Sequence, residues 1–372
     1  MKITRVETIY LRLPQVKEQC ASGQDALIVR VETDAGITGI GEVDSNPMAV
    51  KGAIDGPFSH TTTSGLAHLV LGEDPFETEK LWHKMYRGNI YSGRRGIGIH
   101  AMSGIDMALW DIKGKALGMP VWKLLGGGFH QKIRCYASSL FGATPKETGE
   151  RARAYADRGF TAVKFGWDPM GQDEKTDIAL VGEARKGLGE ENDLLIDAGL
   201  VWDAKTAIQR AYAFADSNIY WLEEPLRPDD YEGYRKLSKA TRVRIAAGEE
   251  ESNRQSYLDL MDRGRVDVVQ VDLTRCGGFT EGMKIASLAA DRGLPVANHG
   301  FTTYINVAAA LHWLNSIPNA LICEFVAENG TTLRDSITRQ RIQAKDGYLE
   351  IPQEPGLGIE LNDEAVSKYR VA

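Results

Sequence analysis

The chain has 372 residues, 43% apolar side chains and a formal net charge of −7, with no block of Lys or Arg. This charge pattern argues against a nucleic-acid partner, and no apolar run approaches the roughly 20 residues of a membrane span. The four cysteines lack zinc-ligand or paired spacing, and the N-terminal stretch lacks the apolar core of a signal peptide, so we expect a soluble, cytoplasmic protein.

The first hundred or so residues predict a small α+β unit. Residues 26–43 resemble two antiparallel strands that turn at Gly36. A helix is expected over 100–118, where apolar residues share one face and Gly118 ends the helical pattern. We place the end of this N-terminal domain near residue 126, so that it covers 1–126.

From about residue 132 onward, short apolar runs alternate with helix-like stretches. The runs are mostly apolar rather than strictly alternating, as expected for parallel strands covered on both faces. The helix-like stretches between them include 174–187, 203–215, 253–263 and 279–292. This regular alternation predicts a β/α barrel, with a doubly wound open sheet as the alternative.

Six polar residues follow these apolar runs at a step of roughly 25 residues, the length of one strand, one helix and two connections. They are Asp197, Glu223, Glu249, Asp272, His299 and Glu324. If the units close into a barrel, all six side chains converge on the carboxyl-end face, where barrel enzymes carry their chemistry.

Three of the six, Asp197, Glu223 and Glu249, occupy consecutive strand ends. Three carboxylates brought that close cannot all stay ionised without a cation among them. A set of oxygen ligands suits a hard divalent ion, and Mg²⁺ tolerates carboxylates together with water and substrate oxygens. The alternative for each residue is a solvated loop acid or a helix cap.

The remaining residues suggest acid–base chemistry. Asp272 lies one unit before His299 and could hold one imidazole nitrogen, which would raise the basicity of the other. Lys164 ends a strand one unit before Asp197 and would help polarise a carboxylate substrate; otherwise it is a surface lysine. Glu324 could be a protonated hydrogen-bond donor, because crowding by other acids raises a carboxyl pKa; otherwise it is a rim carboxylate paired with a basic residue.

Several motifs follow one another along the chain: IDMALWDIKGKALGMPVWKLLGG, AVKFG, LLIDAG, WLEEPL, AAGEE, VVQVDLTRCGG, VANHG and ICEFV. Their order resembles that of the enolase superfamily, specifically its mandelate racemase subgroup. The resemblance implies an N-terminal α+β capping domain and a modified (β/α)₇β barrel over 127–330. It also implies a C-terminal segment, 331–372, that returns to the cap.

By position, the resemblance places the family's ligands for one Mg²⁺ per subunit on Asp197, Glu223 and Glu249. Asp272 stands where muconate-lactonizing relatives carry a catalytic lysine, so with His299 it indicates the subgroup with a His–Asp dyad. The resemblance further implies that Glu324 stabilises an enediolate. It also implies a small carboxylate substrate and a homo-oligomer, a dimer or an octamer.

One departure from the subgroup decides the expected reaction. Relatives often carry Lys-x-Lys, but here Lys164 is followed by Phe165 and Gly166, so the second lysine is absent. Elimination of water can proceed with one base, whereas racemisation needs acid–base groups on both faces of the α-carbon. We therefore expect dehydration of an acid sugar, an aldonate or aldarate, to a 2-keto-3-deoxy acid, with His299 as base. The alternatives are a racemase, epimerase or cycloisomerase that uses Lys164 as second base, and a binding barrel without turnover.

Substrate specificity is expected to come from the cap. The stretches 14–24 and 44–59 have the Gly, Ser, Pro and Asn content of closing loops, which is equally that of ordinary surface loops. Trp167 and Trp202 follow strand ends, and they either wall the substrate pocket or pack the barrel rim.

Overall fold

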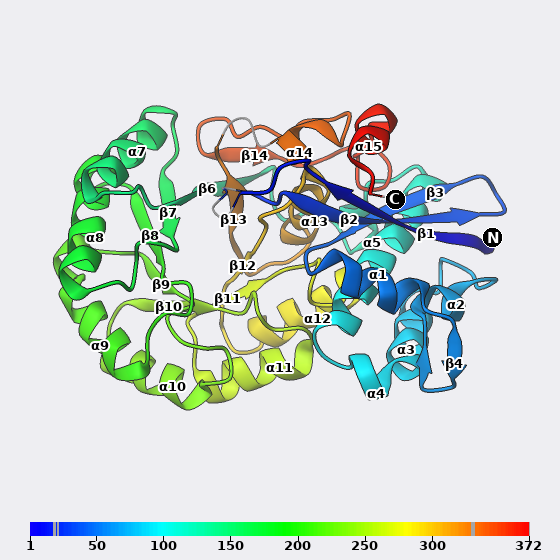
Figure 1. Ribbon diagram of the computed structural model, residues 1–372, viewed down its shortest axis with the longest axis horizontal. Helices are drawn as coiled ribbons and strands as arrows, with labels where there is room; N and C mark the ends of the chain where they lie inside the picture. Colours follow the sequence, from blue (N-terminus) through cyan, green and yellow to red (C-terminus); the bar gives the residue numbers. More distant parts are fainter. Residues whose placement is uncertain (18–19, 21, 329–331, 372) are drawn as a thin grey trace.

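The computed structural model describes residues 1–17, 20, 22–328 and 332–371, in a cap and a barrel that lie side by side (Figure 1). Positions 18, 19 and 21 of the expected cap loop lie outside the described residues, as do positions 331 and 372 of the C-terminal segment. Among the helices of the described ranges, none is long and apolar enough to cross a membrane.

The cap is built on a three-stranded antiparallel sheet covered by helices. Its strands are β1 (Ile3–Arg12), β2 (Asp25–Thr33) and β3 (Thr38–Val43). Gly36 has a φ of 73° in the turn between β2 and β3, which confirms the expected hairpin. The helices are α1 (Pro47–Asp55), α2 (Leu66–Val70), α3 (Thr78–Gly88), α4 (Ile90–Gly93) and α5 (Ile97–Leu117); a small hairpin, β4 (Phe58–His60) and β5 (Thr63–Ser64), follows α1.

Glycines let α5 lie unusually close to the sheet. A Cβ atom on Gly41 would lie 2.1 Å from the carbonyl oxygen of Gly104, and one on Gly39 would lie 2.1 Å from that of Ala108. Any larger residue at these positions of β3 would push the helix away. The expected helix end is also confirmed, because Gly118 caps α5 in the left-handed region.

The second unit is a closed parallel barrel. Its strands are β6 (Lys132–Leu140), β7 (Ala162–Gly166), β8 (Asp193–Asp197), β9 (Trp221–Glu223), β10 (Arg244–Ala247), β11 (Val268–Val271), β12 (Val296–Asn298) and β13 (Ala320–Val326). They pair in chain order, and β13 pairs with β6 to close the ring. After the short helix α6 (Val121–Leu124), seven helices alternate with the eight strands in the described part of the chain. This arrangement confirms the expected (β/α)₇β barrel.

The helices between the strands are α7 (Pro145–Asp157), α8 (Glu174–Leu188), α9 (Ala204–Ala213), α10 (Tyr231–Ala240), α11 (Arg254–Asp259), α12 (Gly278–Ala290) and α13 (Tyr304–Asn315). They match the predicted stretches with one difference. The helix expected over 253–263 stops as an α-helix at Asp259 and continues as a π-helical turn, Leu260–Gly264. Arg265 then ends that turn in the left-handed region.

Side chains fill the interior of the barrel. Tyr136, Leu195, Trp221, Val268 and Ile322 are among the buried residues that pack against one another there. The interior is therefore a packed core rather than a pore, and chemistry is confined to the mouth at the carboxyl ends of the strands.

The C-terminal segment runs back to the cap (Figure 1). It contains α14 (Thr332–Ser336), β14 (Tyr348–Glu350), which pairs antiparallel with β6, and α15 (Asp363–Tyr369). Leu11 of β1 forms a β-bridge with Arg370, whose Nη2 donates to Oε1 of Glu7 at 2.9 Å. The C-terminal segment thus contacts both the barrel, through β6, and the cap, through β1.

Candidate active site

The ammonium group of Lys164 on β7 lies among carboxylates at the barrel mouth. Its Nζ lies 2.5 Å from Oε1 of Glu223, 2.8 Å from Oε1 of Glu324 and 3.8 Å from Oδ2 of Asp197. Burial alone would lower the pKa of Lys164, but Glu223 and Glu324 raise it well above its usual value. Lys164 is therefore held as a cation, deeper in the site than a surface lysine would be.

Asp197, Glu223 and Glu249 stand on neighbouring strand ends, as the sequence predicts. Asp197 and Glu223 are register partners on β8 and β9, and Glu249 comes two residues after the end of β10. Nε1 of Trp221 donates to Oε2 of Glu223 at 2.9 Å, which fixes that carboxylate. Burial is the main reason that the pKa of Asp197 rises to about 6 and that of Glu223 to about 8.

These carboxylates fit a divalent cation. Burial and mutual repulsion disfavour their ionised forms, and the single charge of Lys164 faces several acids. Oxygen donors on rigid strand ends are the ligands that a hard ion such as Mg²⁺ prefers. Asp197, Glu223 and Glu249 are thus the residues that could hold such an ion.

A second polar cluster joins Asp272 and His299 as expected. Nδ1 of His299 lies 2.6 Å from Oδ2 of Asp272, while Oδ1 of Asp272 accepts hydrogen bonds from both N and Oγ1 of Thr274. Burial would raise the pKa of Asp272, but the hydrogen bond from His299 holds it below its usual value. The carboxylate therefore fixes the tautomer and orientation of the imidazole.

The other imidazole nitrogen of His299 faces Glu249, one of the three carboxylates that could hold the ion. Its Nε2 lies 3.6 Å from Oε1 of Glu249. Burial lowers the pKa of His299, but Glu249, the hydrogen bond with Asp272 and Glu324 together raise it to about 10. Neutralising the charge of Glu249 would bring the pKa of His299 back toward the range of a base at neutral pH.

Arg275 is a site residue that the sequence reasoning missed. Its Nη2 donates to Oδ2 of Asp44 in the cap at 2.7 Å, its Nη1 donates to the carbonyl oxygen of Glu249, and its Nε lies 3.8 Å from Oδ2 of Asp272. The available signal was its position in the same strand-end turn as Asp272. Asp44, Asp272 and His299 have ligand atoms within 4.8 Å of one another, but Arg275 already supplies their positive charge.

The expectation of a protonated Glu324 is wrong for this structure. Burial raises its pKa, but Lys164 and His299, together with hydrogen bonds from Lys164 and the Gly300 N–H, bring it below its usual value. Crowding by acids did not predict the charge of Glu324 correctly, because the sequence did not reveal that two cations and a backbone donor surround this carboxylate.

A cavity of about 130 Å³ opens between these groups. It is lined by residues that include Asp44, Ser138, Ser139, Lys164, Trp167, Asp197, Glu249, Arg275, His299 and Glu324. Trp167 therefore walls the site, whereas Trp202 is buried and packs on Phe214. Asp44, from the expected cap loop over 44–59, reaches the cavity, but residues 47–55 of that stretch form the helix α1 rather than a loop.

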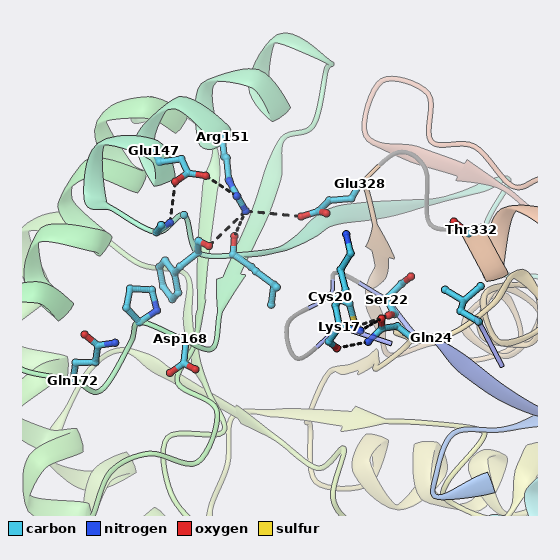
Figure 2. Close-up of a pocket in the computed structure, with 17 residues that line it drawn as sticks. Lys17, Cys20, Ser22, Gln24, Glu147, Arg151, Asp168, Gln172, Glu328 and Thr332 are labelled. Atoms are coloured by element: carbon cyan, nitrogen blue, oxygen red, sulfur yellow. Dashed lines mark hydrogen bonds and ion pairs between the residues drawn. The ribbon is translucent and has the colours of Figure 1, made fainter. Parts of the chain in front are cut away.

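A larger pocket of about 650 Å³ adjoins the cavity at Leu140, which lines both. Figure 2 shows polar side chains of the cap and of the barrel facing each other across it. Lys17, Ser22 and Gln24, from the expected loop over 14–24, form one side.

Comparison with known proteins agrees with this arrangement. The model of the mandelate racemase / muconate lactonizing enzyme N-terminal domain matches residues 3–126, and the enolase C-terminal domain-like model matches residues 147–365. A D-galactarolactone cycloisomerase of Agrobacterium fabrum is 32% identical over 100% of this chain and 99% of its own length. A D-galactonate dehydratase of Pectobacterium atrosepticum is 32% identical, with 98% of this chain and 94% of the relative covered. The crystal structure of a racemase from Streptomyces coelicolor A3(2) with bound magnesium has a TM-score of 0.88 and 28% identity, covering 99% of this chain and 100% of that one.

Proposed function

This chain belongs to the mandelate racemase / muconate lactonizing enzyme family of the enolase superfamily, and we propose that it dehydrates an acid sugar. The substrate is an aldonate or aldarate, and the products are a 2-keto-3-deoxy acid and water. The observation that carries the proposal is the pairing of His299 with Asp272 beside a buried set of carboxylates and Lys164. A positioned base and a cationic site for a carboxylate are the two requirements for removing the proton next to that carboxylate.

The reaction breaks two bonds of the substrate. Nε2 of His299 takes the proton from C2, and the electrons of the C2–H bond form the C2–C3 double bond as the C3–O bond breaks. The same imidazolium returns its proton to the departing hydroxyl, which leaves as water. The resulting enol becomes the 2-keto acid when C3 takes a proton from solvent and the hydroxyl on C2 releases its proton.

Lys164 and Glu324 act on the carboxylate end of the substrate. The Lys164 ammonium stabilises negative charge that develops on the carboxylate oxygens, because it is held protonated in a buried site. Glu324 fixes Lys164 through their 2.8 Å contact. In this proposal Glu324 orients the cation rather than donating a proton.

The proposal includes one Mg²⁺ per subunit, held by Asp197, Glu223 and Glu249. Bound there, it would supply positive charge to the substrate carboxylate and neutralise Glu249 beside His299. The Streptomyces racemase with bound magnesium supports this choice of ion. We also propose a cytoplasmic homo-oligomer, a dimer or an octamer, as expected from the family resemblance.

An epimerase or cycloisomerase is the second candidate, favoured by the relative named as a D-galactarolactone cycloisomerase. In that reaction Lys164 would be the second base. Its ammonium is, however, bound by two carboxylates, and Gly166 takes the place where a further lysine would stand. His299 is the one clear base among the described residues of this site, which favours dehydration.

A screen of four- to six-carbon aldonic and aldaric acids with Mg²⁺ tests the proposal through the formation of 2-keto acid. Keto acid from one or a few acids, lost in His299→Asn, is the expected result. His60→Asn, the same substitution on the exposed strand β4, is the control. No keto acid from the complete set, nor from any glycosylated derivative of its members, would overturn the proposal.

A further inference from the structure

The catalytic cavity is small for a complete substrate. Its volume is about 130 Å³, whereas pockets that enclose a small molecule measure roughly 300–1,000 Å³. It has room for the reacting end of an acid sugar, the carboxylate with C2 and C3. The rest of the substrate must extend beyond it.

The space into which it extends is the outer pocket, defined as the 650 Å³ pocket that adjoins the cavity at Leu140. The barrel supplies one side of it through the loops that follow β6 and β7 and through the first turns of α7 (Figure 2). This volume is large enough for a complete sugar ring rather than a few carbon atoms.

The charges in the outer pocket favour a neutral occupant. Among the residues that the structure describes, Lys17 and Arg151 line it together with three acids, Glu147, Asp168 and Glu328. Arg151 is already engaged, because its Nη2 lies 2.7 Å from Oε1 of Glu147 and its Nη1 donates to the carbonyl oxygen of Leu140. A second carboxylate or a phosphate would therefore meet an excess of negative charge, whereas hydroxyl groups could bond to donors and acceptors alike.

Trp167 stands at the junction of the two spaces. It lines the catalytic cavity, and the next residue, Asp168, lines the outer pocket. The residue is 52% exposed, and its φ of 69° is a conformation that a bulky residue adopts only when its surroundings enforce it. An exposed indole at this point offers an apolar face for the C–H groups of a sugar ring.

We propose that the outer pocket is a subsite for a neutral glycosyl unit, so that the substrate is an aldonic acid with a sugar attached beyond C3. The inference rests on the proposed dehydration, which breaks bonds at C2 and C3 only. The attached sugar is therefore on C4, C5 or C6, and its glycosidic bond stays intact. The product is the glycosylated 2-keto-3-deoxy acid, with one water released.

The test compares six-carbon aldonates with their 4-O- and 6-O-glycosyl derivatives in the presence of Mg²⁺. For at least one matched pair, kcat/KM for keto acid formation should be higher for the glycosylated acid by at least about tenfold. Ala143→Phe, which narrows the outer pocket, should lower that ratio by a similar factor. Ala154→Phe, on an exposed position of α7 that does not line the pocket, should keep the wild-type ratio. A wild-type preference for the unsubstituted acids, or an unchanged ratio in Ala143→Phe, would overturn the subsite.

Calorimetric binding of the same matched pairs separates this inference from the proposed reaction. In one outcome no acid is dehydrated, the glycosylated acids bind more tightly, and Ala143→Phe removes this difference in affinity. That result would support the subsite and overturn the dehydratase proposal. If the acids of each pair bind equally, or none binds, the subsite is overturned.

Discussion

Nδ1 of His299 lies 2.6 Å from Oδ2 of Asp272, and the register of two strands sets this contact. Val271 of β11 pairs with Asn298 of β12, so the residues that follow them emerge side by side. The His299 N–H also donates to the carbonyl oxygen of Val271 at 3.1 Å. The dyad is thus positioned by the barrel itself rather than by a mobile loop.

Removing either member of this dyad should lower turnover. His299→Asn should reduce kcat by about 10²–10⁴-fold, because a positioned general base contributes that much. Asp272→Asn should reduce it less, because the imidazole remains but loses its orientation. Steady-state kinetics on the substrate found in the acid-sugar screen measures both effects. Activity of His299→Asn close to that of His60→Asn would rule out His299 as the base.

Lys164 should control both stability and the response to Mg²⁺. Lys164→Met leaves buried carboxylates without their cation, a change that typically costs about 3–5 kcal/mol. A divalent ion is proposed to bind the same acids, so Mg²⁺ should raise the Tm of this variant more than that of the wild type. Thermal melts in EDTA and in Mg²⁺ measure this, with Lys146→Met on the exposed face of α7 as control. An equal rise in both proteins would contradict the proposed position of the metal.

The pair Arg275–Asp44 should couple the cap to the barrel. A double-mutant cycle with Arg275→Met and Asp44→Asn should give a coupling energy of about 1–3 kcal/mol, because the pair is largely enclosed. The exposed pair Lys186–Glu183 has a similar distance of 2.6 Å, and the same kind of cycle there should give less than about 0.5 kcal/mol. Urea unfolding measures both cycles, and equal coupling energies would show that Arg275 does not join the two units.

Glu42 should make stability depend on pH. It is fully buried between β3 and α13, where Oγ1 of Thr303 and the N–H of Asn306 donate to its Oε2. Burial raises the pKa of Glu42 from 4.5 to about 8. Between these two values the folded state keeps a proton that the unfolded state loses, so the free energy of unfolding should fall as the pH rises.

Glu42→Gln keeps the shape of the protonated side chain but cannot ionise. Its free energy of unfolding should exceed that of the wild type by a few kcal/mol near pH 8, with the difference vanishing toward pH 4.5. Urea unfolding across this range measures the effect, and Glu191→Gln at an exposed position is the control. A difference that stays constant with pH would mean that Glu42 is ionised in the folded protein.

The sequence predicted the barrel and most of the site because both follow from one regular step along the chain. Polar residues at successive strand ends lie close together once the strands close into a barrel, whichever side chains pack its core. Arg275, Asp44 and Glu42 escaped prediction because each of them has a partner in the other unit, and no periodic pattern relates cap to barrel. Glu324 was placed correctly but given the wrong charge state, because charge depends on neighbours that only the folded chain brings together.

The most direct test of the account is turnover of the substrate acid in D₂O with Mg²⁺, followed by NMR. We expect a 2-keto-3-deoxy acid that carries deuterium at C3, formed by the wild type and lost in His299→Asn. Deuterium at C2 of an epimerised acid, with no keto acid, would contradict dehydration and establish the epimerase instead.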